Sequence, residues 1–290
     1  MKIIKIIGGL GNQMFQYAFY LALKNRYPNE EIKLDINLFK TYQLHNGFEL
    51  EKVFHISAPY ATPKEISRIS YYVPNYKLQR VIRKLLPARR TEYIEKCDFL
   101  FQPEVFRTGD CYYEGYWQNY RYFDDIFSEV SAAFSFKNGL ERKNKMILEQ
   151  ISNNQQAVSI HIRRGDYINH KTLGNICDIE YYTKAIQLIF HHYSNPCFYI
   201  FSNDISWCRN NLMVLFRKCQ CYFIDWNIGT DSYIDMQLMS ACKNNILANS
   251  SFSWWAAYLN SYSDKIIIAP KKWAYTQYST NILLDSWTLI

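Results

Sequence analysis

Two clusters of polar residues in the second half of the chain carry the groups best suited to chemistry. One is His161-Ile162-Arg163-Arg164-Gly165-Asp166-Tyr167, and the other is Asn249-Ser250-Ser251-Phe252-Ser253-Trp254-Trp255. Adjacent guanidinium groups stay charged at every working pH and make bidentate contacts with phosphate. Serines at a helix start cap free N–H groups, and such N–H groups also hold phosphate. The two clusters together predict a diphosphate-binding site.

Each cluster also has a purely structural interpretation. An arginine–aspartate network could brace a domain boundary, and the serines could do no more than cap a helix. Asp166 either orients one of the two arginines or acts as a base. Convergence of both clusters at one edge of one sheet favours the ligand-binding interpretation. The chain has no Gly-x-x-x-x-Gly-Lys-[Ser/Thr] segment, which argues against a phosphate-cleaving P-loop enzyme.

A third polar turn, near the N-terminus, supports an alternative function. Gly9-x-Gly11-x-x-Met14 resembles a dinucleotide fingerprint, with Asp35 at the end of the next predicted strand. Met14 stands where the third glycine would allow close helix–strand packing, so the signal is weak. An NAD(P)- or flavin-dependent oxidoreductase is nevertheless one alternative. Alternatively, Asn12 and Gln13 at the helix start offer their side-chain amides to a ligand.

The elements that must position these residues alternate between strands and helices. We expect strands at 2–7, 32–36, 111–117, 157–162, 197–201, 221–224, 245–248 and 265–269, and helices at 14–26, 63–72, 76–86, 180–191, 206–216, 233–242 and 252–259. This alternation predicts an α/β protein with two Rossmann-like domains, 1–145 and 146–290, whose parallel sheets face across a cleft. Ligands of such sheets bind beyond the carboxyl ends of the strands, which selects residues 8–13, 161–167, 202–204 and 249–253.

Composition excludes several classes of protein. The chain has 290 residues, a net charge of 33 − 26 = +7 and 17% aromatic residues, which rules out collagen-like, low-complexity and disordered chains. The moderate basic excess indicates an anionic partner, and we expect no nucleic acid. No apolar run is long enough to span a bilayer, and the first residues lack the pattern of a signal peptide. We interpret the eight scattered cysteines as free thiols in a reducing cytosol, and we predict no metal site.

Several motifs together resemble the α-1,2-fucosyltransferases of glycosyltransferase family eleven. The matching segments are Gly8-Gly9-Leu10-Gly11-Asn12-Gln13-Met14-Phe15-Gln16, the His161–Tyr167 cluster, Phe201-Ser202-Asn203-Asp204, Asp235-Met236-Gln237-Leu238-Met239-Ser240 and Asn249–Tyr258. They occur in order over nearly the whole chain. The resemblance implies a GT-B fold and transfer of fucose, with inversion, from GDP-fucose to the 2-hydroxyl of a galactose in an oligosaccharide or lipid-linked glycan. It also implies that no metal is required.

The family pattern assigns roles to individual residues. It implies that Arg163 contacts the donor diphosphate, that His161 and Asp235 hold the guanosine, and that Ser251 and Ser253 meet phosphate. We count Arg164 and Ser250 with these donor-binding residues, and we expect Asn12 to reach the donor from the first domain. Distant relatives carry a glutamate beyond the arginine pair, whereas this chain has Ile168-Asn169-His170-Lys171. Asp166 is therefore the candidate base beside Arg163. A catalytically inactive GDP-sugar-binding module is the second alternative function.

Residues 77–90 form a separate, basic feature. Leu78, Val81, Ile82, Leu85 and Leu86 make one apolar stripe, and no acidic residue interrupts the surrounding lysines and arginines. Such a helix either lies on an anionic membrane or packs on the first domain with a solvated basic face. The first interpretation predicts a cytoplasmic protein that is peripheral on the inner face of the membrane.

Overall fold

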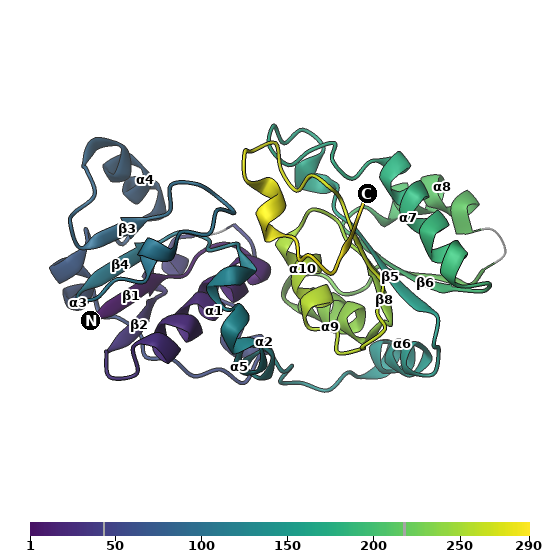
Figure 1. The fold of residues 1–290 in the computed structure, drawn as a ribbon, viewed down its shortest axis with the longest axis horizontal. Helices are drawn as coiled ribbons and strands as arrows, with labels where there is room; N and C mark the ends of the chain where they lie inside the picture. The colour runs from purple at the N-terminus through teal and green to yellow at the C-terminus, as the bar shows by residue number, and fades with distance from the viewer. Residues whose placement is uncertain (43, 217–218) are drawn as a thin grey trace. The chain divides into compact units, whose positions relative to one another are not determined.

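The chain folds into two compact units, Met1–Lys137 and Asn138–Ile290. The computed structural model describes residues 1–42, 44–216 and 219–290. In these ranges each unit has one sheet of parallel strands connected through helices (Figure 1). The predicted fold class, α/β with two parallel sheets, is confirmed. The boundary expected after residue 145 falls inside helix α6 (Arg142–Ser152), which packs on helix α9 (Tyr233–Ala241), so the structure divides the chain earlier.

The N-terminal unit is built on a sheet with the strand order β2-β1-β4-β3. Its elements are β1 (Lys2–Lys5), α1 (Leu10–Arg26), β2 (Ile32–Asp35), α2 (Leu50–Val53), α3 (Pro63–Ile69), α4 (Tyr76–Leu85), β3 (Glu92–Ile94), β4 (Cys111–Glu114) and α5 (Phe127–Ala133). Sequence analysis did not predict α2, β3 or α5, because these short elements show too little periodicity.

The C-terminal unit has the strand order β10-β9-β8-β5-β6-β7. Besides α6 and α9, its elements are β5 (Ala157–Ile162), α7 (Ile179–His192), β6 (Cys197–Ser202), α8 (Ile205–Leu212), β7 (Cys221–Ile224), β8 (Asn244–Ile246), α10 (Ser251–Tyr258), β9 (Ile267–Ala269) and β10 (Thr288–Leu289). All except α6 and β10 match predicted elements to within a few residues, and α8 continues as a 3-10 turn through Phe216. Helix α6 was missed because Ile147 and Ile151 are its only buried residues among those described.

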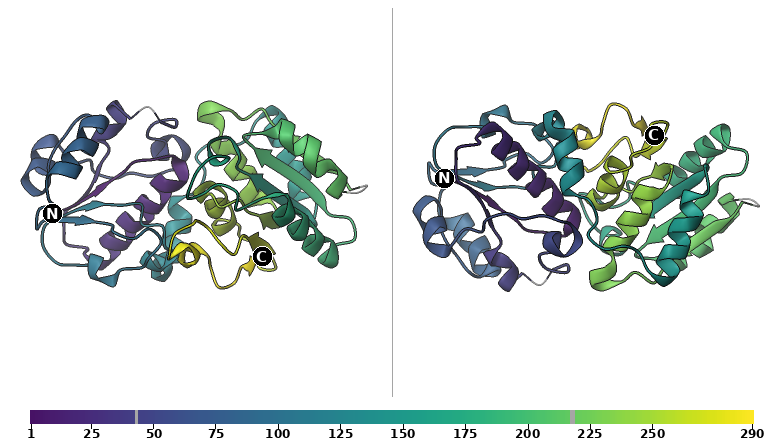
Figure 2. Two further views of the ribbon diagram at one scale, coloured as in Figure 1. Left: turned by 90° about the horizontal axis from the view of Figure 1, so that it is seen from above. Right: turned by 90° about the horizontal axis from the view of Figure 1, so that it is seen from below.

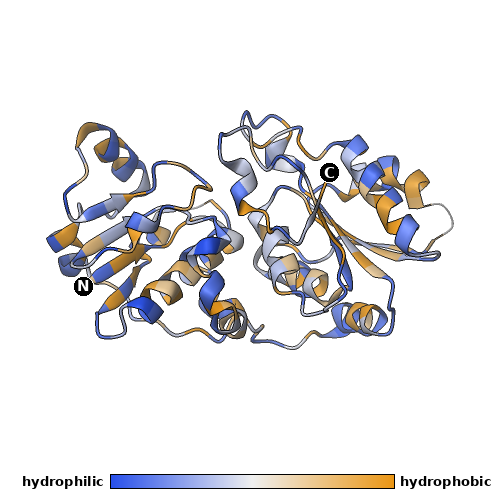
Figure 3. Ribbon diagram, in the orientation of Figure 1, coloured by the Kyte–Doolittle hydropathy of each residue, from blue (hydrophilic) through white to orange (hydrophobic). Residues whose placement is uncertain are grey.

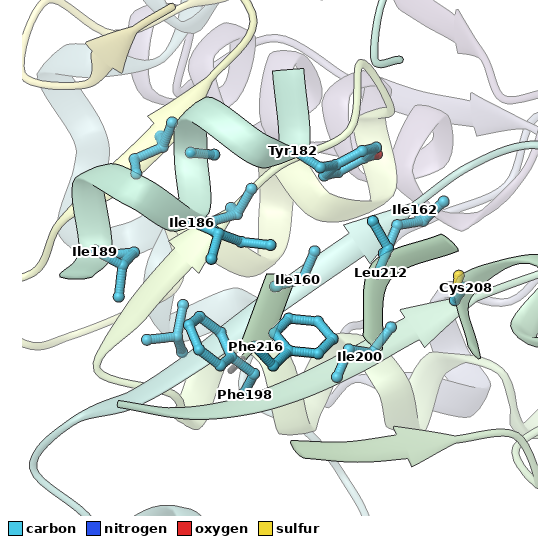
Figure 4. Close-up of a cluster of buried hydrophobic side chains, with 14 of the residues drawn as sticks. Ile160, Ile162, Tyr182, Ile186, Ile189, Phe198, Ile200, Cys208, Leu212 and Phe216 are labelled. Carbon is cyan, nitrogen blue, oxygen red and sulfur yellow. The ribbon is translucent and has the colours of Figure 1, made fainter. Parts of the chain in front are cut away.

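Helices cover both faces of the C-terminal sheet. Figure 2 shows α7 and α8 on one face and α9 and α10 on the other. Under α7 and α8, side chains from β5 and β6 pack in an apolar cluster (Figure 4), which includes Ile160, Phe198, Ile186 and Leu212. Each fully buried side chain of this size stabilises the fold by about 1.5–3 kcal/mol. The buried sheet is therefore a rigid base for the loops at its edges.

Strand β1 buries charge as well as apolar surface. Lys2 and Lys5 are almost inaccessible. The Lys2 ammonium binds Glu30 at 2.8 Å and the carbonyl of Gly109 at 2.8 Å. The Lys5 ammonium binds Glu114 and the side-chain oxygen of Gln79, each at 2.7 Å. A buried ammonium is tolerated because it is paired and hydrogen-bonded in this way.

Helix α4 is attached to the sheet by polar side chains. Gln79 is buried against Lys5, and Arg83 forms ion pairs with Glu92 at 2.8 Å and Glu114 at 2.7 Å. The apolar residues of the helix point elsewhere: Leu78, Val81 and Leu85 are 51%, 52% and 74% exposed. Figure 3 shows hydrophobic and hydrophilic residues alternating along this helix. The amphipathic pattern is therefore reversed relative to an ordinary surface helix, which buries its apolar face.

Cysteines and membrane-spanning segments complete the description of the fold. The eight cysteines all lie in the described ranges, and each is a free thiol. In the part of the chain that the structure describes, no helix combines the length and the apolar character needed to cross a membrane.

Candidate active site

The strand order of the C-terminal sheet reverses between β5 and β8. The chain leaves β5 toward β6 and β7, then returns through α9 to β8 on the other side of β5. At such a switch point the two outgoing loops run in opposite directions and leave room for a ligand at the carboxyl edge of the sheet. The His161–Tyr167 cluster spans the end of β5 and the loop after it, and the Asn249–Ser253 cluster spans the turn after β8 and the start of α10. The structure thus places both polar clusters at one position.

Arg163 and Asp166 form a two-pronged ion pair in the loop after β5. Nε of Arg163 lies 2.9 Å from one carboxylate oxygen of Asp166, and Nη2 lies 3.1 Å from the other. Both groups retain exposed surface. A planar guanidinium held at two points has a fixed orientation and still has N–H groups for a further anion. Asp166 therefore orients Arg163, with both of its oxygens engaged.

Arg164 points toward a different set of partners. Its Nε lies 3.2 Å from Asp204, and its guanidinium lies 3.9 Å from the centre of the Trp207 ring. Its backbone N–H donates to the side chain of Asn203 at 2.9 Å. Asp204 also caps α8, because it accepts the N–H of Trp207. The predicted donor-binding residue Arg164 thus connects the loops after β5 and β6.

Asn203 and Gly165 explain the shape of this loop. A Cβ atom on Gly165 would lie 2.5 Å from the amide nitrogen of Asn203, so a larger residue would displace the side chain that accepts the Arg164 N–H. The Phe201-Ser202-Asn203-Asp204 segment therefore supports the arginine loop from the neighbouring strand.

His161 is buried at the end of β5. Its imidazole lies beside the ring of Phe252 at 5.8 Å between centroids, which connects β5 to α10. Burial, together with the nearby charge of Arg163, lowers the pKa of His161 to about 3, so the ring is neutral at physiological pH. Its Nδ1 atom is buried and has no hydrogen-bond partner among the described residues. A buried nitrogen of this kind at a switch point is available to a ligand.

The serines at the start of α10 differ in their availability. Ser250 is the N-cap and accepts the N–H of Phe252 at 3.4 Å, and it is also a hydrogen-bond partner of Tyr167. Ser253 is fully buried, and its hydroxyl donates to the carbonyls of Ala248 and Ser250. Its single proton is thus used inside the turn, whereas Ser250 and Ser251 lie at the helix start. The Tyr167–Ser250 contact joins the two predicted clusters directly.

Asp235 lies in the first turn of α9, and no interaction described for it reaches the arginine loop. Asn227 donates to its carboxylate at 2.7 Å, and Asn144 in turn bonds Asn227 and Trp226. Burial raises the pKa of Asp235 to about 7, and the hydrogen bond from Asn227 only partly offsets this. A carboxylate so poorly solvated gains much from a ligand that donates two N–H groups.

Asn12 lies in the N-terminal unit, at the reversal of that unit's strand order between β1 and β4. Its side-chain oxygen accepts a hydrogen bond from Gln118 at 2.7 Å. Gly8 has a φ of +95° and approaches Asn12 so closely that a Cβ would lie 2.9 Å from its amide nitrogen. The adjacent Gln13 is fully buried and holds the carbonyls of Gly8 and Gly47, so its amide serves the fold and not a ligand.

Sequence analysis missed a polar group at the carboxyl edge of the N-terminal sheet. Glu95 directly follows β3 and Glu114 ends β4, where Lys5 and Arg83 pair with Glu114. Arg83 also pairs with Glu92 at the start of β3. The available signal was acidic residues at strand ends. It was lost because β3 itself was not predicted.

Metal ligands were not expected. In residues 1–42, 44–216 and 219–290, no group of three or more His, Cys, Asp or Glu side chains is arranged to hold a metal ion.

Comparison with known proteins identifies the class. A crystal structure of NodZ α-1,6-fucosyltransferase soaked with GDP-fucose matches with a TM-score of 0.51 at 13% identity, covering 89% of this chain and 92% of that one. This likeness shows that the two α/β units have the GT-B fold. The chain as a whole, residues 1–290, matches the family described as glycosyl transferase family 11. The protein belongs to this family, which contradicts the oxidoreductase alternative.

Curated relatives cover most of the chain. An α-1,2-colitosyltransferase of Escherichia coli is 34% identical over 283 residues, which are 93% of this chain and 91% of the relative. The O-antigen biosynthesis glycosyltransferase WbnK of Escherichia coli is 31% identical, covering 97% of each chain. Galactoside α-(1,2)-fucosyltransferase 2 of Hylobates lar is 26% identical, covering 93% of this chain and 71% of the relative.

Proposed function

We propose that the protein transfers L-fucose from GDP-fucose to the 2-hydroxyl of a galactose residue in a glycan, with inversion at the fucose anomeric carbon. The observation that carries the donor assignment is Arg163, oriented by Asp166 beside the start of α10. The α-1,2 linkage is supported by the names of relatives, an α-1,2-colitosyltransferase and a galactoside α-(1,2)-fucosyltransferase.

The proposed chemistry follows from the leaving group. The acceptor hydroxyl oxygen attacks the anomeric carbon, the bond from that carbon to the diphosphate oxygen breaks, and GDP leaves with the electron pair. The growing negative charge needs fixed donors aimed at it. Arg163 supplies a positive charge, and the start of α10 supplies backbone N–H donors with a favourable dipole. We propose that these groups make a divalent cation unnecessary.

The remaining donor contacts are assigned from the same geometry. Guanine presents two N–H groups on one edge, which match the carboxylate of Asp235. His161 offers its unpartnered Nδ1 atom to the nucleotide, and Ser250 and Ser251 meet phosphate. Asn12 of the N-terminal unit is proposed as a donor contact on the family pattern alone. Ser253 is left with the role of fixing the turn.

A second donor is favoured by one specific observation. The 34% identical relative is named as a colitosyltransferase. Colitose is the 3-deoxy counterpart of fucose, so the two GDP-sugars differ by one hydroxyl and share every nucleotide contact. GDP-colitose is therefore the competing donor.

Helix α4 supports a proposal about location. Its exposed surface combines Leu78, Val81 and Leu85 with exposed Lys77 and Arg80, and no acidic residue occurs between residues 76 and 91. Apolar side chains flanked by basic ones complement an anionic lipid surface, to which each lysine or arginine adds about 1 kcal/mol. We propose that α4 holds the enzyme on the inner face of the membrane, near lipid-linked acceptors. Free thiols fit a reducing compartment.

The reaction itself is tested with GDP-fucose, GDP-colitose and a panel of galactosides, followed by linkage analysis of the product. We expect fucose on the 2-hydroxyl of galactose and full activity in EDTA. Preferred use of GDP-colitose would replace the donor. A strict divalent requirement would contradict the metal-free proposal, and binding of GDP-fucose without its consumption would indicate a non-catalytic module.

Removing the oriented cation tests the diphosphate contact. We expect Arg163→Ala to lower kcat by about 10²–10³, the scale of one lost charge-stabilising donor. Asp166→Asn should lower kcat by a smaller factor than Arg163→Ala, because it loosens Arg163 without removing it. Arg209→Ala removes an exposed arginine of the same unit and should leave kcat unchanged. Near-normal turnover of a folded Arg163→Ala protein would remove Arg163 from this role. An equal loss in Asp166→Asn with a changed pH profile would make Asp166 the base.

The raised pKa of Asp235 predicts that donor binding depends on pH. The ionised carboxylate accepts the guanine N–H groups, so binding should weaken as pH falls through about 7. A group with this pKa makes Kd for GDP-fucose about tenfold higher at pH 6 than at pH 8. Calorimetry with the intact sugar nucleotide avoids the titrating phosphate of free GDP. Asp235→Asn should abolish the dependence, whereas the exposed Asp225→Asn should preserve it. A pH-independent Kd in the wild type would refute the assignment.

Membrane binding is tested by co-sedimentation with phosphatidylglycerol-containing and pure phosphatidylcholine vesicles. We expect binding to the anionic vesicles only, decreasing with salt and lost in Val81→Ser/Leu85→Ser. The matched control Val214→Ser/Ile228→Ser removes two exposed apolar residues of the C-terminal unit and should bind normally. No sedimentation at low salt would exclude the membrane contact.

A further inference from the structure

The N-terminal unit contains a pocket that the donor contacts do not use. It has a volume of about 340 Å³ and opens where β1, β3 and β4 end, beside α4. This volume is at the lower end of the range for small-molecule sites. The residues that matter for its chemistry are Lys5, Arg83, Glu114, Glu95, Tyr76 and Tyr116, which all line it.

The charges in one wall of the pocket are already paired with one another. The carboxylate of Glu114 lies 2.7 Å from the ammonium of Lys5 and 2.7 Å from the guanidinium of Arg83. Burial opposes ionisation of Glu114, but Lys5 and Arg83 outweigh burial and lower its pKa. Lys5 and Arg83 are therefore committed to Glu114. Of the other charged residues that line the pocket, Arg80 is basic, and Glu95 and Asp98 are acidic.

Glu95 is different because one of its oxygens has neither a hydrogen bond nor an ion pair among the described residues. Its Oε2 atom accepts the backbone N–H groups of Tyr116 at 2.7 Å and Trp117 at 3.2 Å. Its Oε1 atom is buried and has no hydrogen-bond partner in the described part of the chain. Burial raises the pKa of Glu95 to about 7, against those two hydrogen bonds and with the like charge of Asp98 adding to the shift. An unsatisfied carboxylate oxygen is costly, and a ligand that donates a hydrogen bond removes the cost.

The backbone around Glu95 is shaped for this contact. A Cβ atom on Gly115 would lie 2.6 Å from Cβ of Glu95 and 2.7 Å from its Oε2, so the approach requires glycine. Trp117 has a φ of 56°, a conformation that is strained for a bulky residue, and its fully buried ring stacks on Phe19 at 4.5 Å. Core packing thus maintains the strained turn that holds Glu95.

Aromatic rings provide the other part of the pocket. Tyr76 and Tyr116 line it and present both ring surface and hydroxyl groups. Burial raises the pKa of Tyr116, which therefore stays a neutral phenol. Hydrogen-bond acceptors next to aromatic surface suit a neutral ligand that has several hydroxyl donors and an apolar C–H face. A pyranose has this combination.

We propose that this pocket binds a pyranose residue of the acceptor glycan, and that Oε1 of Glu95 accepts a hydrogen bond from one of its hydroxyl groups. The inference rests on the proposed function for the identity of the sugar, a galactoside. The unpartnered Oε1 of Glu95 and the lining tyrosine rings together favour a hydroxylated ligand as the occupant.

The test measures sugar binding without a donor, by NMR titration with methyl galactoside, methyl glucoside and methyl mannoside. We expect galactoside binding to weaken tenfold or more in Glu95→Gln. In that variant the amide oxygen must stay with the Tyr116 and Trp117 N–H groups, which turns the NH₂ group toward the sugar. The same change at the exposed Glu104, Glu104→Gln, should have no effect. Equal affinity of wild type and Glu95→Gln for every sugar would overturn the proposal.

Fluorinated galactosides test which hydroxyl group of the sugar donates a hydrogen bond to Glu95. Fluorine accepts but does not donate a hydrogen bond, so one monodeoxyfluoro-galactoside should bind the wild type tenfold or more weakly and lose nothing further in Glu95→Gln. Gly115→Ala should mimic Glu95→Gln, with folding checked by thermal denaturation. The proposal would also be overturned if none of the 3-, 4- and 6-fluoro analogues bound the wild type more weakly while losing nothing further in Glu95→Gln.

Kinetics separate this proposal from the proposed function. Glu95→Gln should raise KM for the galactoside while slow hydrolysis of GDP-fucose by water stays unchanged. Loss of donor hydrolysis together with transfer would place Glu95 in the donor site and overturn the pocket assignment. A wild type that binds galactoside through Glu95 but never consumes GDP-fucose would refute the proposed function and leave the pocket standing.

Discussion

The reversal of strand order between β5 and β8 is the constraint on which the candidate active site depends. It makes the loop after β5 and the turn before α10 neighbours at one carboxyl edge, although nearly 90 residues separate them in the chain. The contacts between these two segments follow from that placement, namely the Tyr167–Ser250 bond and the packing of His161 on Phe252. The two adjacent arginines then have different partners, because Asp166 pairs with Arg163 and Asp204 pairs with Arg164.

A second constraint acts in the N-terminal unit, where buried charges must be compensated. Lys5 and Arg83 both require Glu114, and this requirement turns the polar side of α4 toward the sheet. Breaking one partner of such a network leaves an uncompensated buried charge. The apolar residues of α4 are exposed as a consequence. One set of ion pairs therefore shapes both the pocket wall and the surface proposed to meet lipid.

Family membership and side-chain geometry inform different levels of function. Membership establishes a glycosyltransferase, and relatives of similar identity differ in the sugar named for them. Discrimination between fucose and colitose concerns one hydroxyl, which a few contacts decide. Side-chain geometry adds information that the names of relatives do not carry. The hydroxyl of Ser253 is hydrogen-bonded inside the turn, and the amide of Gln13 is fully hydrogen-bonded within the fold. Those contacts exclude Ser253 and Gln13 from the residues that are available to bind a ligand.

The sequence by itself determined the α/β class, most elements of the C-terminal unit and the segments that form its site. It could do so because buried parallel strands are continuous apolar runs and because the motifs are local in the chain. Short elements such as β3 and weakly apolar ones such as α6 were not predicted from the sequence, since few of their residues are buried. The reversed orientation of α4 and the partnerless oxygen of Glu95 were decided only by tertiary structure. Both features depend on which charged groups meet across distant strands, and the periodicity of a single segment cannot predict that pairing.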